Sequence, residues 1–171
     1  KIKSIDILYI STIAQKYFPH FSSGYGEAGE KNAKYYIKMK KLFISNLNQK
    51  IINKIYYKDY PIAKKNNLPE HKLNVDFNNE LKKMPLLYTD NDIPNCESLI
   101  AKSKIVICDY LSTPYNSALL SNVPTIILFN TKSYLLTDKY QSFYNNLINA
   151  NMMFTDPIKA AEFLNNNYRN I

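Results

Sequence analysis

Residues 104–130 read KIVICDYLSTPYNSALLSNVPTIILFN, and this stretch decides the fold of the chain. Its two apolar runs, 105–108 and 125–129, are uninterrupted and rich in β-branched residues, which is typical of strands buried on both faces of a parallel sheet. Between them, Ser112 is a candidate N-cap and Pro114 suits the first turn of a helix. The stretch therefore predicts a strand, a polar turn, a short helix and a second strand.

The polar turn of this unit is the first candidate site. In open α/β sheets, ligands bind at the carboxyl ends of the strands, where the N-termini of the following helices offer N–H groups to anions. Asp109, Ser112 and Thr113 fall at that point of the sequence. We therefore expect these three residues to border a site for an anionic ligand.

The same residues resemble the nucleotide-binding half of GT-B glycosyltransferases. The matching pattern is Asp-Tyr-x-Ser-Thr at 109–113, followed after a helix by Pro-Thr-Ile at 124–126. It is most similar to bacterial transferases of surface carbohydrate assembly, and more distantly similar to the CDP-glycerol glycerophosphotransferases that make teichoic acids. In that group an acidic residue that often holds the donor ribose stands where this chain has Asn116. Asn116 is therefore a candidate donor contact that departs from the family pattern.

The resemblance implies a transferase that moves a sugar or a polyol phosphate from a nucleotide-activated donor to a glycan or lipid-linked acceptor. Residues 1–171 would form a single Rossmann-like domain, the carboxy-terminal part of a larger transferase whose amino-terminal domain is missing from this sequence. Asp109 would orient the turn, while Ser112 and Thr113 would hold the diphosphate of the donor. Lys58, near the end of a predicted strand, would add positive charge beside the leaving nucleotide.

A second reading, from another class of function, stays open. A non-catalytic binding or interaction module can keep a GT-B-like fold after losing donor binding. The replacement of the usual acidic residue by Asn116 motivates this alternative.

All three glycines of the chain follow the predicted first strand, 5–10, in one polar and aromatic loop. Glycines at this position provide unusual backbone angles or close backbone approach in the phosphate loops of Rossmann-like domains. Gly24 and Gly26 are therefore candidate donor-binding residues, with a surface loop that binds nothing as the alternative. His20, in the same loop, is a candidate general base or phosphate ligand, or else a loop histidine without a role.

Strand and helix patterns alternate along the rest of the chain, which predicts an α/β fold with a Rossmann-like doubly wound parallel sheet of five to six strands. The resemblance makes this sheet one half of a GT-B architecture. In the first helix Tyr36 falls on the core face with lysines opposite, and Tyr140 and Phe143 fall at core spacing in a later helix. The expected elements outside the central unit are a helix at 32–50, a strand at 54–61, a loop at 62–83 with a helical turn at 77–83, a strand at 86–88, helices at 95–103 and 138–150, a strand at 152–154 and a final helix capped by Asp156.

The composition restricts the classes of partner. The formal net charge is +8, but the lysines are scattered and no arginine cluster or aromatic-interleaved basic stripe is present, so we expect no nucleic-acid partner. Abundant Lys, Asn, Ile and Tyr together with the absence of Trp are typical of an AT-rich genome, which explains the charge without selection for it.

The sequence predicts neither a metal site nor a bound cofactor. Cys96 and Cys108 lack metal-ligand spacing to each other or to a histidine, and Asp90 with Asp92 is interpreted as a capped helix start rather than a metal pair. Walker motifs and nucleophile elbows are absent. With no signal peptide or apolar run of membrane-spanning length, we expect a cytoplasmic protein, either free or peripherally associated with the inner face of the membrane.

Overall fold

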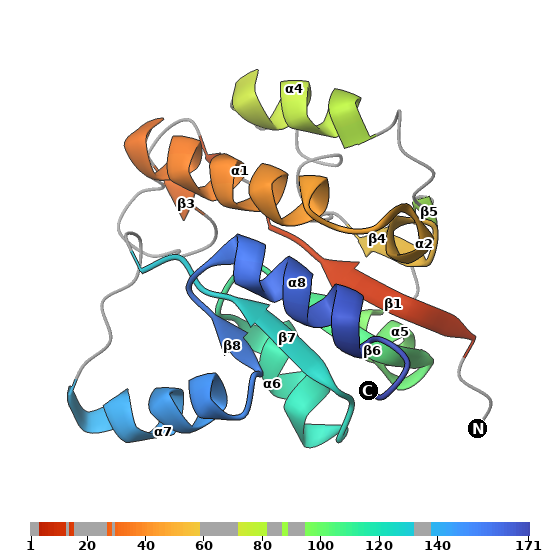
Figure 1. The fold of residues 1–171 in the computed structure, drawn as a ribbon. Helices are drawn as coiled ribbons and strands as arrows, with labels where there is room; N and C mark the ends of the chain where they lie inside the picture. Colours follow the sequence, from red (N-terminus) through yellow and green to blue (C-terminus); the bar gives the residue numbers. More distant parts are fainter. Residues whose placement is uncertain are drawn as a thin grey trace.

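A computed structural model describes residues 4–12, 14–15, 27–28, 30–58, 72–81, 87–88, 95–131 and 138–171. The main strands are β1 (Ile5–Ile10), β4 (Ile55–Lys58), β5 (Leu87–Tyr88), β6 (Ser103–Cys108), β7 (Thr125–Leu128) and β8 (Met153–Phe154). Within the described residues they form one six-stranded sheet in the order β5-β4-β1-β6-β7-β8, with every neighbouring pair parallel (Figure 1). The predicted parallel α/β sheet of five to six strands is confirmed.

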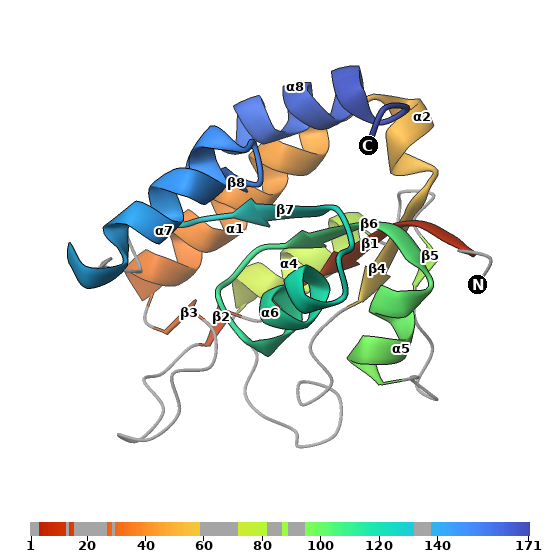
Figure 2. The same cartoon turned by 90° about the horizontal axis from the view of Figure 1, so that it is seen from below.

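Helices cover both faces of this sheet. They are α1 (Glu30–Ser45), α2 (Gln49–Ile52), α4 (Lys72–Leu81), α5 (Cys96–Ala101), α6 (Thr113–Leu120), α7 (Asp138–Asn149) and α8 (Pro157–Asn167). Figure 2 shows α1 and α8 side by side on one face, and α5 and α6 on the opposite face. The fold is therefore doubly wound, as the alternation of strands and helices predicted.

The strand order places a topological switch point between β1 and β6. The next two strands of this sheet, β4 and β5, extend it to one side of β1, and its last three strands extend it to the other side. In open α/β sheets the crevice outside the carboxyl ends of the strands at such a point is the usual position for a ligand. The ends of β1 and β6 are therefore the place to look for a site.

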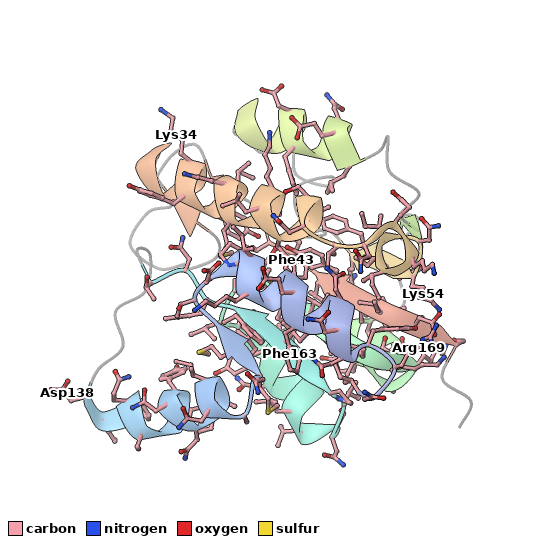
Figure 3. The ribbon with its side chains drawn as sticks, viewed as in Figure 1. Lys34, Phe43, Lys54, Asp138, Phe163 and Arg169 are labelled. Atoms are coloured by element: carbon pink, nitrogen blue, oxygen red, sulfur yellow. The ribbon has the colours of Figure 1, made fainter. Side chains whose placement is uncertain are left out.

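The alternation of side chains along β1 divides the core into two layers. Ile7 and Tyr9 pack on the α1 and α8 side, whereas Leu8 and Ile10 pack on the α5 and α6 side. All four are buried because β1 has a neighbour on each edge and helices on each face. On α1, Phe43 contributes to the first layer while Lys34 points away from the sheet (Figure 3).

Asparagine ends two helices in place of the usual glycine. Asn122 after α6 and Asn151 after α7 have φ angles of 52° and 55°, in the left-handed region. In each case the next residue, Val123 or Met152, donates its N–H to a carbonyl five residues back, and the asparagine donates to one three residues back. This is the Schellman arrangement, and asparagine tolerates its left-handed position better than other non-glycine residues do.

Three helical expectations were wrong in part. The helix expected at 32–50 is interrupted, since α1 ends at Ser45 and α2 begins at Gln49. The stretch expected to be a loop with one helical turn contains the ten-residue helix α4. On α7 the side chains of Tyr140 and Phe143 are 52% and 46% exposed, because the helix lies beside the edge strand β8, where only its Leu147 side is covered.

A short parallel pair follows β1. It joins β2 (Ala14–Gln15) to β3 (Glu27–Ala28), so residues 14–15 and 27–28 lie beside each other. His20, Gly24 and Gly26 belong to the segment 16–26 and lie outside the described residues. No helix in the described part of the chain is both long and apolar enough to cross a membrane.

Candidate functional site

At the switch point, where β1 and β6 end, the apolar residues of the strands are followed by polar ones. The backbone pairing of the two strands extends to Ile10 and Cys108, and beyond it come Ser11 and Thr12 on one strand and Asp109 on the other. All three polar residues are buried. Buried polar side chains need hydrogen-bond partners, and the structure supplies them from three elements.

Asp109 joins the two strand ends directly. Its side chain is fully buried; one carboxylate oxygen accepts from Ser11 Oγ at 2.7 Å, and the other accepts from the backbone N–H of Thr12 at 3.3 Å. The sequence predicted that Asp109 orients the turn after β6. The structure places it at that turn but turns its side chain inward, toward the end of β1.

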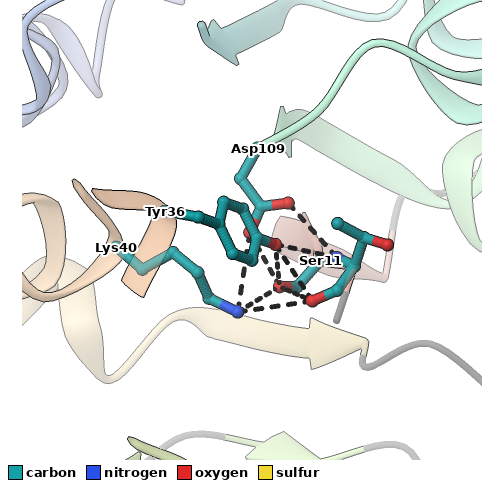
Figure 4. A network of polar contacts seen from close by, with 5 residues as sticks. Ser11, Tyr36, Lys40 and Asp109 are labelled. Carbon is teal, nitrogen blue, oxygen red and sulfur yellow. Dashed lines mark hydrogen bonds and ion pairs between the residues drawn. The ribbon is translucent and has the colours of Figure 1, made fainter. Parts of the chain in front are cut away.

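Helix α1 contributes two further side chains, Tyr36 and Lys40, which lie one turn apart on the same face (Figure 4). Lys40 Nζ lies 2.7 Å from Ser11 Oγ, 3.5 Å from the carbonyl oxygen of Thr12 and 3.9 Å from Asp109 Oδ2. The Tyr36 hydroxyl lies 2.9 Å from the same carbonyl oxygen of Thr12. The five residues form one cluster, the strand-end network.

The donors and acceptors of the strand-end network fix the direction of its hydrogen bonds. An ammonium only donates and a carboxylate only accepts, so Lys40 donates to Ser11, and Ser11 donates its single hydroxyl proton to Asp109. The Tyr36 hydroxyl accepts from the N–H of Thr12 at 3.1 Å and donates to the carbonyl of the same residue. The hydroxyl protons of Ser11 and Tyr36 are thus both donated. The hydrogen bonds that Tyr36 and Lys40 of α1 donate are accepted by residues at the end of β1.

Aromatic rings surround the ammonium of Lys40. Its Nζ lies 4.7 Å from the ring centroid of Tyr36 and 4.7 Å from that of Phe77 on α4. Ring faces attract a cation, and this attraction strengthens when water is excluded. The side chain of Lys40 is only 2% exposed, so the charge is kept in the interior by these rings, Ser11 and Asp109.

Burial governs the titration of the strand-end network. It raises the pKa of Asp109 above the usual value for a carboxyl group, and the nearby Lys40 ammonium is the largest influence that opposes this rise. Burial, followed by the charge of Asp109, raises the pKa of Tyr36 well above its usual value. These groups are enclosed and bonded to one another, so the network fits a role in holding the strand ends rather than in reacting with a substrate.

The turn from β6 into α6 lies next to this network and carries the other predicted residues. Ser112 occupies the N-cap position of α6 with Pro114 at the start of the helix, yet its side chain makes no capping hydrogen bond. The side chain of Ser112 is half-buried, and those of Thr113 and Asn116 are exposed. Because Thr113 and Asn116 are three residues apart, they lie on one face of the helix.

Lys58 lies on the other side of the sheet from Asp109. Alternation along β4 places Tyr56 and Lys58 on the α5 side, whereas the contacts of Asp109 place it on the α1 side. Lys58 is buried, and its charge partly opposes the rise that burial causes in the pKa of Cys96, to about 11. The structure therefore brings Asp109, Ser112 and Thr113 together at one turn and keeps Lys58 apart from them.

Sequence reasoning missed the α1 side of the site. The first helix was expected to carry its lysines on the solvent face, but Lys40 is buried. Its spacing from Tyr36 and Phe43, four residues after the first and three before the second, was the available signal. A lysine at a core position of an amphipathic helix indicates a buried partner of opposite charge.

No group of three or more His, Cys, Asp or Glu side chains that could hold a metal ion occurs in the described ranges. Comparison with models of protein families gives a match over residues 1–171 to the family described as LIC12162 family transferase. Neither a search of curated proteins nor a search of solved structures returns a match.

Proposed function

The chain belongs to the LIC12162 family of transferases, and we propose that it is the domain that binds the nucleotide-activated donor. The transferred group is a sugar or a polyol phosphate. The donor diphosphate lies at the N-terminus of α6, where Thr113 contacts it and Asn116 lies toward the nucleoside. The main support for this proposal is the position of the turn, which follows β6 at the switch point of a doubly wound sheet.

The chemistry of the α6 N-terminus supports this assignment. Backbone N–H groups of the first helical turn attract anions, and the helix dipole adds to the attraction. The side chain of Ser112 is not used as a cap for these N–H groups. The hydroxyl of Thr113 is exposed and sits at the first helical position, within reach of a ligand on that end of the helix.

The proposal includes the wider architecture. The Rossmann-like domain described here is one half of a GT-B enzyme, and an amino-terminal domain supplies the other wall of the cleft and the site for a glycan or lipid-linked acceptor. Such an enzyme works in the cytoplasm or at the inner face of the membrane. Roles for His20 as general base and for Gly24 and Gly26 as donor contacts stay predictions, since these residues lie outside the described part of the chain.

Lys58 has a narrower role in this proposal than a direct phosphate contact. Its side chain is 5% exposed and lies across the sheet from Asp109. A buried cation near the carboxyl ends of the strands adds positive potential to the crevice without touching the leaving group. Its effect on the donor would therefore be electrostatic, and smaller than that of Thr113.

Calorimetric titration with CDP-, UDP- and GDP-linked donors and with CMP conjugates tests the proposal. We expect one nucleotide class to bind with a stoichiometry of one per chain and to compete with its own free nucleotide. Absence of binding by every member of the panel, in the chain and in the intact transferase, would overturn it.

Asn116 favours a second candidate, a non-catalytic module that has lost donor binding. The residue stands exposed on α6 where the resembling transferases have an acid. In that case the natural chain binds no nucleotide, and Asn116→Glu creates affinity. Tight binding by the natural chain dismisses this alternative.

A further inference from the structure

We propose that Lys40 is a positioning residue, which sets the placement of the turn after β6 relative to the end of β1 and so shapes the donor crevice. The identity of the ligand as a nucleotide-activated donor rests on the proposed function. The effect of Lys40 on the ends of β1 and β6 does not depend on it. Lys40 does not touch the donor; it acts through Ser11 and Asp109.

The first observation is that one ammonium reaches both strand ends. Lys40 Nζ contacts Ser11 Oγ at 2.7 Å and the Thr12 carbonyl at 3.5 Å on the β1 side, and Asp109 Oδ2 at 3.9 Å on the β6 side. Ser112, the N-cap residue of α6, follows Asp109 by three residues. The placement of α6 is therefore tied to α1 through these side chains and through the sheet.

The second observation is that a lysine in the core is unfavourable for stability alone. Bringing an ammonium and a carboxylate out of water has a large desolvation cost, and apolar side chains of similar size often stabilise a fold as well or better. The charged side chain adds direction, because an ammonium can only donate to Ser11 Oγ, which leaves the Ser11 hydroxyl to donate to Asp109. Hydrogen bonds of fixed direction hold the ends of β1 and β6 in one arrangement, and the geometry of the site depends on that arrangement.

The third observation is that Lys40 has little freedom to move. The rings of Tyr36 and Phe77 lie on its ammonium, and Phe77 comes from α4, which packs on α1. The Tyr36 hydroxyl meanwhile holds the N–H and the carbonyl of Thr12. A group held on several sides transmits its position to its partners, which is the requirement for preorganising a site.

Two variants and one control test the proposal. Lys40→Met removes the ammonium, and Tyr36→Phe removes only the hydroxyl, which keeps a folded variant available if the first fails to fold. Lys41→Met is the matched control, because Lys41 is the next residue on the same helix and forms its ion pair with Glu80 at an exposed position. The readouts are amide hydrogen exchange of the whole chain and donor titration with the nucleotide class that the wild type binds.

We expect both variants to increase amide exchange by about tenfold or more at Thr12 and also at residues 116–117, the first amides that donate within α6, with no change at Asp6 or Lys104 at the far end of the same strands. Donor affinity should fall by about tenfold or more in the same variants and stay unchanged in Lys41→Met. Faster exchange confined to residues 11–12 overturns the coupling of the two strand ends, whether or not any donor binds. Unchanged donor affinity in a folded variant, where the wild type binds, overturns the positioning role.

Discussion

Ser11 Oγ donates a 2.7 Å hydrogen bond to Asp109 Oδ2 and joins the ends of two strands whose residues are 98 positions apart in the chain. The backbone ladder between these strands ends one residue earlier, at Ile10 and Cys108. Side chains therefore continue the connection beyond the sheet. At the switch point the ends of β1 and β6 are thus joined by a polar network of side chains.

The charge pair in this network should show strong coupling. Asp109→Asn replaces one of the two acceptor oxygens by an amide nitrogen that cannot accept, so Ser11 or Thr12 loses its hydrogen-bond acceptor, and we expect the free energy of unfolding to fall by about 1–3 kcal/mol. The double variant Lys40→Met/Asp109→Asn should lose less than the sum of the two single losses, by roughly 1–3 kcal/mol. Urea-induced unfolding of the four proteins measures the difference.

The exposed pair Lys41 and Glu80 provides the control for that cycle. Its ion pair is 2.8 Å long, but both side chains are more than two-fifths exposed. Solvent screening limits such pairs to about 1 kcal/mol or less. Additive losses at Lys40 and Asp109, within about 0.5 kcal/mol, would show that the buried pair contributes no more than this exposed one.

The pH dependence of stability should carry the signature of Asp109. Burial raises the pKa of Asp109 in the folded protein above the ordinary 3.8. As the pH is lowered, Asp109 therefore binds its proton at a higher pH in the folded state than in the unfolded state. The carboxylate therefore lowers stability above its folded pKa, and this cost disappears as the pH falls toward 3.8. The stability of the wild type relative to Asp109→Asn should rise over that range and then level off.

Asp6 should give the opposite slope in the same measurement. Its hydrogen bond from Lys104 lowers its pKa, and Lys54 adds to the effect. The folded state then gains stability from the charged form above the unfolded pKa and loses it as the pH falls through the folded pKa. The wild type should thus lose stability relative to Asp6→Asn below pH 3.8, by about 1 kcal/mol or less because the site is partly exposed.

The two left-handed asparagines predict substitutions of opposite sign. At Asn122 and Asn151, alanine should cost about 1 kcal/mol each, whereas glycine should be neutral or stabilising. Asn166, exposed within α8, is the control, because alanine there should raise stability by a few tenths of a kcal/mol through helix propensity. Thermal unfolding of the five variants decides it; a stabilising Asn122→Ala would contradict the role of that residue as the helix stop.

Two helix starts should respond differently to loss of the cap. Asp156 accepts hydrogen bonds from the backbone N–H groups of Ile158 at 2.9 Å and Lys159 at 3.4 Å, so Asp156→Ala should cost about 0.5–2 kcal/mol. Ser112 occupies the corresponding position of α6 without such a bond, and Ser112→Ala should change stability by about 0.5 kcal/mol or less. Equal losses at the two positions would show that Ser112 does cap α6 in solution.

Thr113 should separate binding from stability. Its hydroxyl is exposed and lies at the first position of α6, so Thr113→Ala should weaken donor binding while leaving the melting temperature nearly unchanged. Ser121→Ala, at the other end of the same helix, is the control for titration and for melting. Unchanged donor affinity in Thr113→Ala, in a protein that binds the donor, would place the site elsewhere.

The elements with strong local signals were predictable from the sequence. Strands β1, β6 and β7 contain the continuous apolar runs 7–10, 105–108 and 126–128, because parallel strands in a covered sheet are buried on both faces. Asp156 and Pro157 mark the start of α8 through capping and a fixed φ angle, and both act as expected. In these cases the residue that predicts the element from the sequence also makes the packing contact or capping hydrogen bond that stabilises it.

Helix α4 was not predictable in the same way. Its sequence is polar and rich in asparagine, which favours a loop. The helix is stabilised by Phe77 and Leu81, four residues apart, which are both buried in the core layer of α1. That stabilisation comes from packing against another element, so a local pattern contains only a weak trace of it.

The strand-end network was the least accessible part of the site. Lys40 could be assigned to the core face from its spacing, but its partners could not, because Ser11 and Asp109 meet only when β1 and β6 become neighbours. The order of strands is a property of the whole chain. For the same reason the motif containing Asp109 indicated the right turn without indicating the direction of its side chain.

The central position of β1 in the sheet has a consequence for folding during synthesis on the ribosome. Among the strands of this sheet β1 is made first, yet its neighbours pair with it through Ile55 and Ile105, far downstream of their common partner Ile7. Until β6 has emerged, one edge of an apolar strand has no neighbour from the sheet, and such edges pair readily with other chains. Expression at low temperature or with a chaperone should therefore increase the yield of this domain by protecting β1 during synthesis.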